Sequence, residues 1–182
     1  ATEGRHGVMY LGYANLFPQG ALNDIELAYD GFSTAAYPLT QQAGKEVFRG
    51  NLISEAIETC ATVEQVVAFL ERYDLSSLAN AMLFFADASD DAVTIEGDVF
   101  LRKQGDFQVV TNFYQSRQDD DLAQCPRFAS ATRLLQARQE TSLDLCRRVL
   151  ATTAQEAGAP TQYSNVFDLQ ARKVWLYHFH NF

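Results

Sequence analysis

Cysteine is scarce in this sequence, and its spacing excludes two kinds of site. The 182 residues contain three cysteines, Cys60, Cys125 and Cys146. An odd and scattered set provides neither a disulfide framework nor a CxxC pair for a metal. We interpret the three side chains as small, buried apolar groups, and a single disulfide between two of them stays open.

Basic residues and long apolar runs are also lacking. The net charge is −9, and a chain this acidic repels a phosphate backbone, so we expect no nucleic-acid partner. The longest apolar run, Ala81 to Ala86, is too short for a membrane span. No charged-then-apolar leader stands at Ala1, which is not an initiator methionine, so we expect a processed or truncated chain.

The composition is that of a globular protein. Hydrophobic residues make up 47% and charged residues 20%, which is typical of a folded domain. A chain of 182 residues fits one domain, residues 1–182, better than two, and it can bury a sizeable core.

Hydrophobic periodicity predicts alternating blocks of strands and helices. Apolar residues at steps of three and four predict helices at residues 45–60, 62–73, 128–135 and 141–153, the second opened by a capping-box pattern at Thr62 and Gln65. Short apolar runs predict strands at residues 7–15, 25–32, 81–86, 92–96, 99–102 and 107–113, and a final hairpin from residues 163–169 and 173–179. The sequence Phe-Pro-Gln-Gly predicts a turn at residues 17–20.

The order of these blocks predicts an α+β layered domain with mostly antiparallel strands. Two sheets packed face to face with helices outside would use every predicted element. One sheet with helices on both faces fits the pattern equally well.

Two asparagines are candidate site residues in a sequence without a Ser-His-Asp order, HExxH, P-loop or GxGxxG motif. Asn23 follows a turn, where its side chain could donate to an oxyanion or, more commonly, close its own turn. Asn112 ends a predicted strand and shares a face with Gln108 and Val110. That position is equally typical of a site residue and of a strand end.

Three further features favour a structural interpretation. His178 and His180 share one strand face without a third ligand, so we predict no metal site there. Arg127 close to Cys125 would lower the pKa of that thiol, but no base is placed to make it a nucleophile. The acidic run at residues 119–121 lacks the spacing of a calcium loop, and we interpret it as an exposed loop.

Several segments, taken in order, resemble a known enzyme family. These segments are residues 7–12, FPQGALND at 17–24, AYDGF at 28–32, LFFADA at 83–88, IEGD at 95–98, QVVTNFYQS at 108–116, PRF at 126–128, YSNVFDL at 163–169 and LYHFHNF at 176–182. They are similar to the N-terminal-nucleophile linear-amide hydrolases, which include penicillin V acylases, choloylglycine (bile-salt) hydrolases and acyl-coenzyme A:6-aminopenicillanate acyltransferases. The resemblance implies a four-layer αββα sandwich, here incomplete at both ends.

The resemblance also implies a mechanism without cofactor or metal. An N-terminal cysteine attacks a small-molecule amide, with its own α-amino group as base. Asn23 and Asn112 match oxyanion donors, and Arg127 matches an arginine near the nucleophile. Loss of one oxyanion donor costs about 10²–10³ in rate. Aromatic residues Phe32, Phe113 and Tyr114 are the candidate lining of an acyl pocket.

The sequence departs from the family pattern where the chemistry is most demanding. Ala1 is not a cysteine, so we expect the nucleophile on a segment that precedes it. Ala21, Leu22 and Asp24 replace the usual Gly, Met and Glu around Asn23. Glu26 stands where Gly is usual, which would strain the turn if it needs a positive φ.

These departures leave the function divided between two classes. The first is a hydrolase or acyltransferase completed by its missing N-terminal segment. The second is an inactive homologue that serves as a ligand-binding or oligomeric scaffold, and a homo-oligomer fits either class. Many relatives are secreted or periplasmic, and a cytoplasmic location is equally open.

Overall fold

The computed structural model describes residues 4–13, 18–117 and 125–182, so the acidic run at residues 119–121 lies outside the described part. The chain divides into two compact units. The first comprises Ala1–Gln108 with Asn112–Ser116, and the second comprises Val109–Thr111 with Arg117–Phe182. Each unit is described by itself.

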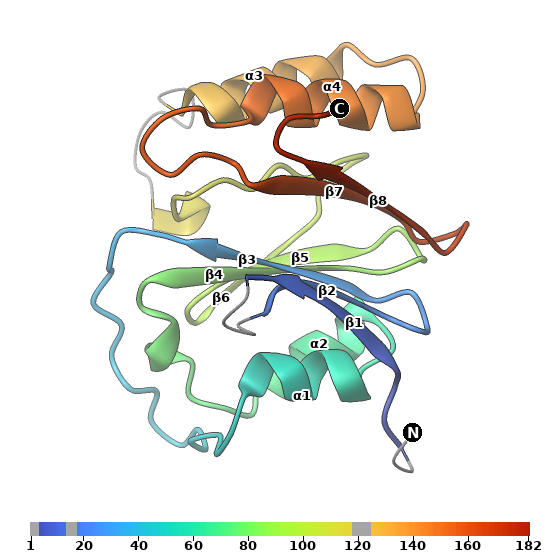
Figure 1. The fold of residues 1–182 in the computed structure, drawn as a ribbon. Helices are drawn as coiled ribbons and strands as arrows, with labels where there is room; N and C mark the ends of the chain where they lie inside the picture. The colour runs from blue at the N-terminus through green and yellow to red at the C-terminus, as the bar shows by residue number, and fades with distance from the viewer. Residues whose placement is uncertain (1–3, 14–17, 118–124) are drawn as a thin grey trace. The chain divides into compact units, whose positions relative to one another are not determined.

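The first unit is built on a six-stranded antiparallel sheet whose strands follow one another in chain order (Figure 1). Helices α1 and α2 cover one face of it. The strands are β1 (Val8–Gly12), β2 (Pro18–Asn23), β3 (Ala28–Ser33), β4 (Ala81–Ala86), β5 (Ala92–Glu96) and β6 (Val99–Arg102), and the helices are α1 (Leu52–Thr59), α2 (Val63–Leu70) and the 3₁₀ turns η1 (Ser76–Leu78) and η2 (Gln115–Arg117).

The core of this unit lies between the sheet and the two helices. Alternate residues of β4, Leu83 and Phe85, are fully buried there. Met82, on the opposite face of the same strand, is also fully buried. The prediction that this apolar run is a strand is therefore confirmed, whereas its face away from the helices is buried at Met82 and half-buried at Phe84.

Side-chain caps set where the two helices begin. Asn51 accepts from the N–H groups of Ile53 and Ser54, so α1 starts at Leu52 and not near residue 45 as predicted. Thr62 accepts from the N–H of Gln65 at 3.2 Å, which confirms the predicted start of α2. The Gln65 side chain accepts from Ala61 rather than from Thr62.

Two predicted elements near the sheet are wrong. Residues 18–20 belong to β2 and not to a turn; Pro18, which has no N–H to donate, is tolerated as the first residue of that strand. Residues 107–113 form no strand. Instead, the Gln108 side chain donates to the Leu101 carbonyl, which faces β5, and to the Thr94 hydroxyl, so this segment is attached to the sheet by a side chain and not by a backbone ladder.

The second unit joins a helix pair to a hairpin. Helices α3 (Pro126–Gln136) and α4 (Leu143–Thr153) pack against each other, and α4 packs on β7 (Tyr163–Asp168), which pairs with β8 (Lys173–His178). These elements match the predicted ones. Each unit therefore combines antiparallel strands with helices, and the stacking of both into four layers stays a prediction.

Candidate functional site

A short segment, Asn112–Ser116, is fastened across one end of the six-stranded sheet. Glu96, the last residue of β5, is fully buried. One of its carboxylate oxygens accepts from the N–H of Gln115 at 2.7 Å and the other from the N–H of Ser116 at 2.8 Å. One buried side chain therefore holds two consecutive backbone N–H groups, so Glu96 fixes the backbone of this segment.

Tyr114 provides the second attachment of the segment. Its hydroxyl donates to the carbonyls of Leu78, at 3.0 Å, and Ala81, at 3.3 Å, where β4 begins. Its ring meets that of Tyr37 edge to face, with 5.9 Å between ring centroids. The side chain is 7% exposed, so Tyr114 serves as an anchor and presents little surface to a ligand.

Asn112 is an exposed residue of this segment and lies at the C-terminal end of β3. Its side-chain Nδ2 donates to the Ser33 carbonyl at 2.7 Å. Phe32 precedes Ser33 on the sheet face away from α1 and α2, opposite Met82, and the half-buried Phe113 follows Asn112. The structure thus brings Asn112 together with the three aromatic residues predicted to bind substrate.

Asn23 lies at the other end of β3. From Ala28 to Ser33 the strand rises about 17 Å. The Asn23 amide Nδ2 donates to the carbonyls of Ile57 and Cys60, each at 3.0 Å. Its Oδ1 accepts from the N–H groups of Ile25 and Leu27. The structure therefore does not bring Asn23 and Asn112 together, and the buried Asn23 closes its own turn against the end of α1.

The turn that Asn23 closes holds an uncommon backbone conformation. Glu26 has φ of +74°, in the left-handed region that favours glycine. A residue with a Cβ is strained there by about 1–2 kcal/mol. The strain predicted for a residue other than glycine at this position is therefore present.

Arg127 belongs to the second unit, in the first turn of α3. The preceding Cys125 caps this helix, and its sulfur lies 3.5 Å from Thr111 Oγ1. Burial raises the pKa of the Cys125 thiol, but hydrogen bonds from Thr111 and the N–H groups of Phe128 and Arg127, together with the charge of Arg127, lower it further than burial raises it. The sequence-based expectation of a lowered thiol pKa beside Arg127 is confirmed.

Asp30 is a titratable residue that the sequence analysis missed. It lies on β3, opposite Gly20 and Phe84, on the same sheet face as Phe32. Burial raises the pKa of its carboxyl to about 7, although the N–H of Gly31 donates to it and lowers the value. A single acid inside the apolar strand AYDGF was the available signal.

The described residues offer little for a metal or a membrane. Within residues 4–13, 18–117 and 125–182, no three His, Cys, Asp or Glu side chains gather closely enough to hold a metal ion. The ring of His178 packs edge to face on that of Phe179, with centroids 4.5 Å apart. Of the helices in the same part of the chain, none is long and apolar enough to cross a membrane.

Comparison with known proteins relates this fold to solved structures. Penicillin V acylase from Agrobacterium tumefaciens superposes with a TM-score of 0.71 at 16% identity, over 95% of this chain and 66% of the acylase. Two variants of conjugated bile acid hydrolase from Clostridium perfringens give TM-scores of 0.63 and 0.62 at 13% identity, over 95% and 96% of this chain and 77% and 74% of theirs.

At these identities the likeness establishes a shared fold. The chain spans just under two thirds of the length of the acylase. No protein-family model and no curated protein matches the sequence.

Proposed function

We propose that this chain is the larger part of an N-terminal-nucleophile amide hydrolase that cleaves linear C–N bonds of small-molecule amides. The observation that carries the proposal is the fold shared over 95% of the chain with penicillin V acylase, joined to the sequence motifs that resemble the same family. The nucleophile is a cysteine on a segment other than residues 1–182.

The reaction follows from the chemistry of such a cysteine. Its thiol transfers a proton to its own α-amino group as the sulfur attacks the amide carbonyl, and a tetrahedral oxyanion forms. The ammonium returns the proton to the leaving nitrogen, the C–N bond breaks, and an acyl-enzyme remains. Water releases the acyl group in a hydrolase, whereas an amine takes it in an acyltransferase.

Asn112 is the oxyanion donor in this proposal. Its side chain is exposed, and the segment that carries it is fastened by Glu96 and Tyr114. A donor held in place before reaction stabilises developing charge without reorganisation. Phe32 and Phe113 contact the acyl group, Tyr114 positions the segment, and Arg127 supports the charge of the nucleophile.

Asn23 has a different place in the proposal. Its amide N–H groups are directed to two backbone carbonyls, so it shapes the turn after β2. The two asparagines can be separated by experiment. Asn112→Ala should lower kcat by about 10²–10³ with an unchanged melting temperature, and Asn23→Ala should instead lower the melting temperature.

The test uses the product of the complete gene. Intact mass and N-terminal sequencing should find a mature N-terminal cysteine, and incubation with penicillins, bile-salt conjugates, acyl-homoserine lactones and peptide-like amides should reveal turnover and a covalent acyl adduct on that residue. A mature chain without an N-terminal cysteine, and without turnover, would overturn the proposal. It would favour the inactive scaffold. The supporting observation is that the Asn23 amide already donates to the backbone carbonyls of Ile57 and Cys60.

A further inference from the structure

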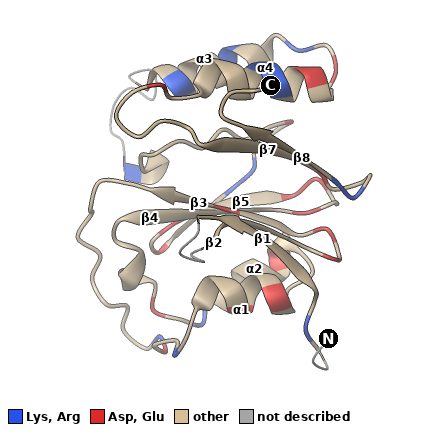
Figure 2. Ribbon diagram, in the orientation of Figure 1, with Lys and Arg blue, Asp and Glu red and all other residues tan. Residues whose placement is uncertain are grey.

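Asp30 is the single charged residue in the first four strands of the sheet. The sequences of β1 to β4 contain no lysine or arginine, so no blue appears on these strands in Figure 2, and no other acid. Among the residues that the structure describes, none forms an ion pair with Asp30, and the N–H of Gly31, 3.0 Å from Oδ1, is the only donor to its carboxylate. Oδ2 accepts no hydrogen bond from the same residues, so it can accept one from a ligand.

The neighbours of Asp30 on its face of the sheet are uncharged. Ala28 and Phe32 flank it along β3, Gly20 lies opposite on β2, and Phe84 lies opposite on β4. A Cβ added at Gly20 would lie 3.6 Å from Asp30 Oδ1, so the carboxyl extends toward the glycine. A glycine inside a strand often marks a place where a ligand comes close to the backbone. Within the first unit, the carboxyl thus has two phenylalanines as neighbours and no side chain on the Gly20 side.

The same strand connects Asp30 with the candidate oxyanion donor. Phe32 follows Asp30 on the same face, and the carbonyl of the next residue, Ser33, accepts from Asn112 Nδ2 at 2.7 Å. Three residues of a strand span about 10 Å. An extended acyl chain whose carbonyl oxygen binds Asn112 can therefore pass Phe32 and bring its far end to Asp30.

An unpaired, half-buried carboxyl favours a positively charged neighbour. The pKa of Asp30 rises to about 7 because burial penalises the ionised form. An opposite charge within about 4–6 Å stabilises that form again. An ammonium group also supplies N–H donors, which Oδ2 lacks within the described residues. An amine therefore complements this position better than an apolar or an acidic group does.

We propose that Asp30 selects amide substrates whose acyl chain ends in a positively charged amine. The inference rests on the proposed function and names its substrate class. In such a substrate the carbonyl oxygen binds Asn112, the middle of the chain contacts Phe32, and the terminal ammonium pairs with the Asp30 carboxylate. Asp30 determines specificity and takes no part in cleavage, because it lies about 10 Å along the strand from the position of Asn112.

Kinetic measurements on the product of the complete gene test this selection. The substrates are two series of p-nitroanilides, one with ω-aminoacyl chains and one with methyl-terminated acyl chains of the same length. At one chain length, kcat/KM should be at least about tenfold higher for the amine. Shorter and longer chains should lose most of this preference, because the distance between the donor and the carboxyl is fixed.

Asp30→Asn removes the charge and keeps the shape of the side chain. It should abolish the preference for the amine, mainly by raising KM for the amine-terminated substrate. The matched control is Asp144→Asn, which removes a carboxyl whose side chain is 73% exposed and should keep the preference. This control separates Asp30 from the general attraction of cations to a chain with a net charge of −9. Circular dichroism checks that both variants fold.

A second measurement does not depend on turnover. The matched methyl ketones keep the carbonyl and cannot be hydrolysed, and NMR of labelled aspartate carboxyl carbons follows the titration of Asp30, assigned by its loss in Asp30→Asn. The amine-terminated ketone should lower the pKa of Asp30, because an ammonium favours the ionised carboxyl. The methyl-terminated ketone should raise this pKa, because it displaces water from the carboxyl.

Failure of this inference and failure of the proposed function give different results. Opposite pKa changes with the two ketones, without turnover of either series, would contradict the amidase and support charge selection by Asp30. Turnover with the same amine preference in the wild type and in Asp30→Asn would support the amidase and overturn the role of Asp30. A pKa of Asp30 that neither ketone changes would overturn that role as well.

Discussion

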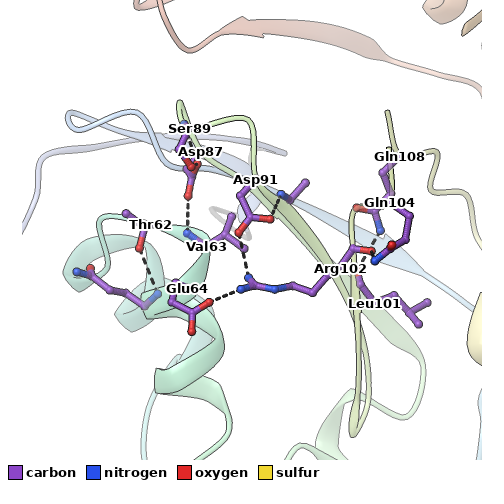
Figure 3. Close-up of polar contacts among 12 residues, drawn as sticks. Thr62, Val63, Glu64, Asp87, Ser89, Asp91, Leu101, Arg102, Gln104 and Gln108 are labelled. Carbon is purple, nitrogen blue, oxygen red and sulfur yellow. Dashed lines mark hydrogen bonds and ion pairs between the residues drawn. The ribbon is translucent and has the colours of Figure 1, made fainter. Parts of the chain in front are cut away.

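The two edges of the six-stranded sheet differ in how they end. At β6, Arg102 forms ion pairs with Glu64 and Asp91, and the Gln108 side chain bonds to Thr94 and to the Leu101 carbonyl, which faces β5 (Figure 3). β1 carries no charged residue, and within the described residues no backbone group bonds to the outward groups of Val8 and Tyr10. The comparison teaches that one edge strand of a sheet can carry an ion-paired side chain while the other is built from uncharged residues alone.

Near each edge strand, one buried polar side chain joins the sheet to a helical segment. Near β1, Asn23 joins the end of β2 to α1. Near β6, Glu96 joins the end of β5 to η2. In β1 to β4, Asp30 is the one charged residue, whereas β5 contains Glu96 and β6 contains Arg102. Charged residues are therefore more frequent in the strands on the β6 side of the sheet than in those on the β1 side.

Asn23→Ala should have the largest effect on stability and should weaken the attachment of α1 to the β1 side of the sheet. The substitution leaves two carbonyls and two N–H groups without their partner, most of them in the interior. We expect a loss of about 3 kcal/mol in the free energy of unfolding, measured by urea denaturation. Asn112→Ala, which removes the exposed hydrogen bond to the Ser33 carbonyl, is the control, and an equal loss in both variants would contradict the assignment.

Glu96→Gln, on the β6 side of the sheet, should lower the free energy of unfolding by about 2 kcal/mol. The glutamine keeps one acceptor oxygen and places an NH₂ group against the second backbone N–H, which stays buried without an acceptor. Urea denaturation gives the change in free energy. Glu64→Gln is the control, since its side chain is 73% exposed and an exposed ion pair is worth under about 1 kcal/mol. Similar losses in the two variants would show that Glu96 is no anchor.

Asp30→Asn should change the pH dependence of stability in the middle of the sheet. The folded-state pKa of about 7 lies above the ordinary value, so the folded state holds the proton more tightly than the unfolded state. The resulting stability is fully present below about pH 4 and is lost as pH rises through 7. A rise in the pKa from 3.8 to about 7 corresponds to about 4 kcal/mol, and solvent screens part of this because Asp30 is half-buried. Asparagine stays neutral, so we expect the variant to exceed the wild type by about 1–2 kcal/mol at pH 8.

Thermal unfolding at pH 4 and pH 8 measures this difference. The exposed Asp144, whose side chain is 73% accessible, provides the control variant Asp144→Asn. If Asp30→Asn gives the same advantage at both pH values, the carboxyl does not titrate near neutrality.

Gln108→Ala should have the smallest effect, a loss of about 1 kcal/mol or less in the free energy of unfolding. It removes a side-chain donor from the Thr94 hydroxyl and from the Leu101 carbonyl, which faces β5. Urea denaturation and hydrogen exchange of the β6 amides are the measurements, and we expect faster exchange in the variant. Gln104→Ala is the control, because its bond to the Arg102 carbonyl is long, at 3.5 Å. Indistinguishable variants would mean that Gln108 does not stabilise the β6 side of the sheet.

Local patterns were sufficient for most elements. The segment QVVTNFYQS made Asn112 a candidate oxyanion donor, and the departure from glycine at residue 26 predicted the strained turn. The resemblance assigned Asn23 to the same oxyanion as Asn112, yet the two lie at opposite ends of β3. Glu96 had no assigned role, because the N–H groups that it binds are 19 and 20 residues further along the chain.

The sequence by itself determined most of the strands and helices and the cap of α2, because these depend on hydrophobic period and on side chains within a few residues. Thr62 and Gln65 are one such pair. Only the tertiary structure decided that residues 107–113 form no strand and that the two edges of the sheet differ. Both outcomes depend on hydrogen bonds between residues far apart in sequence, which no local pattern records.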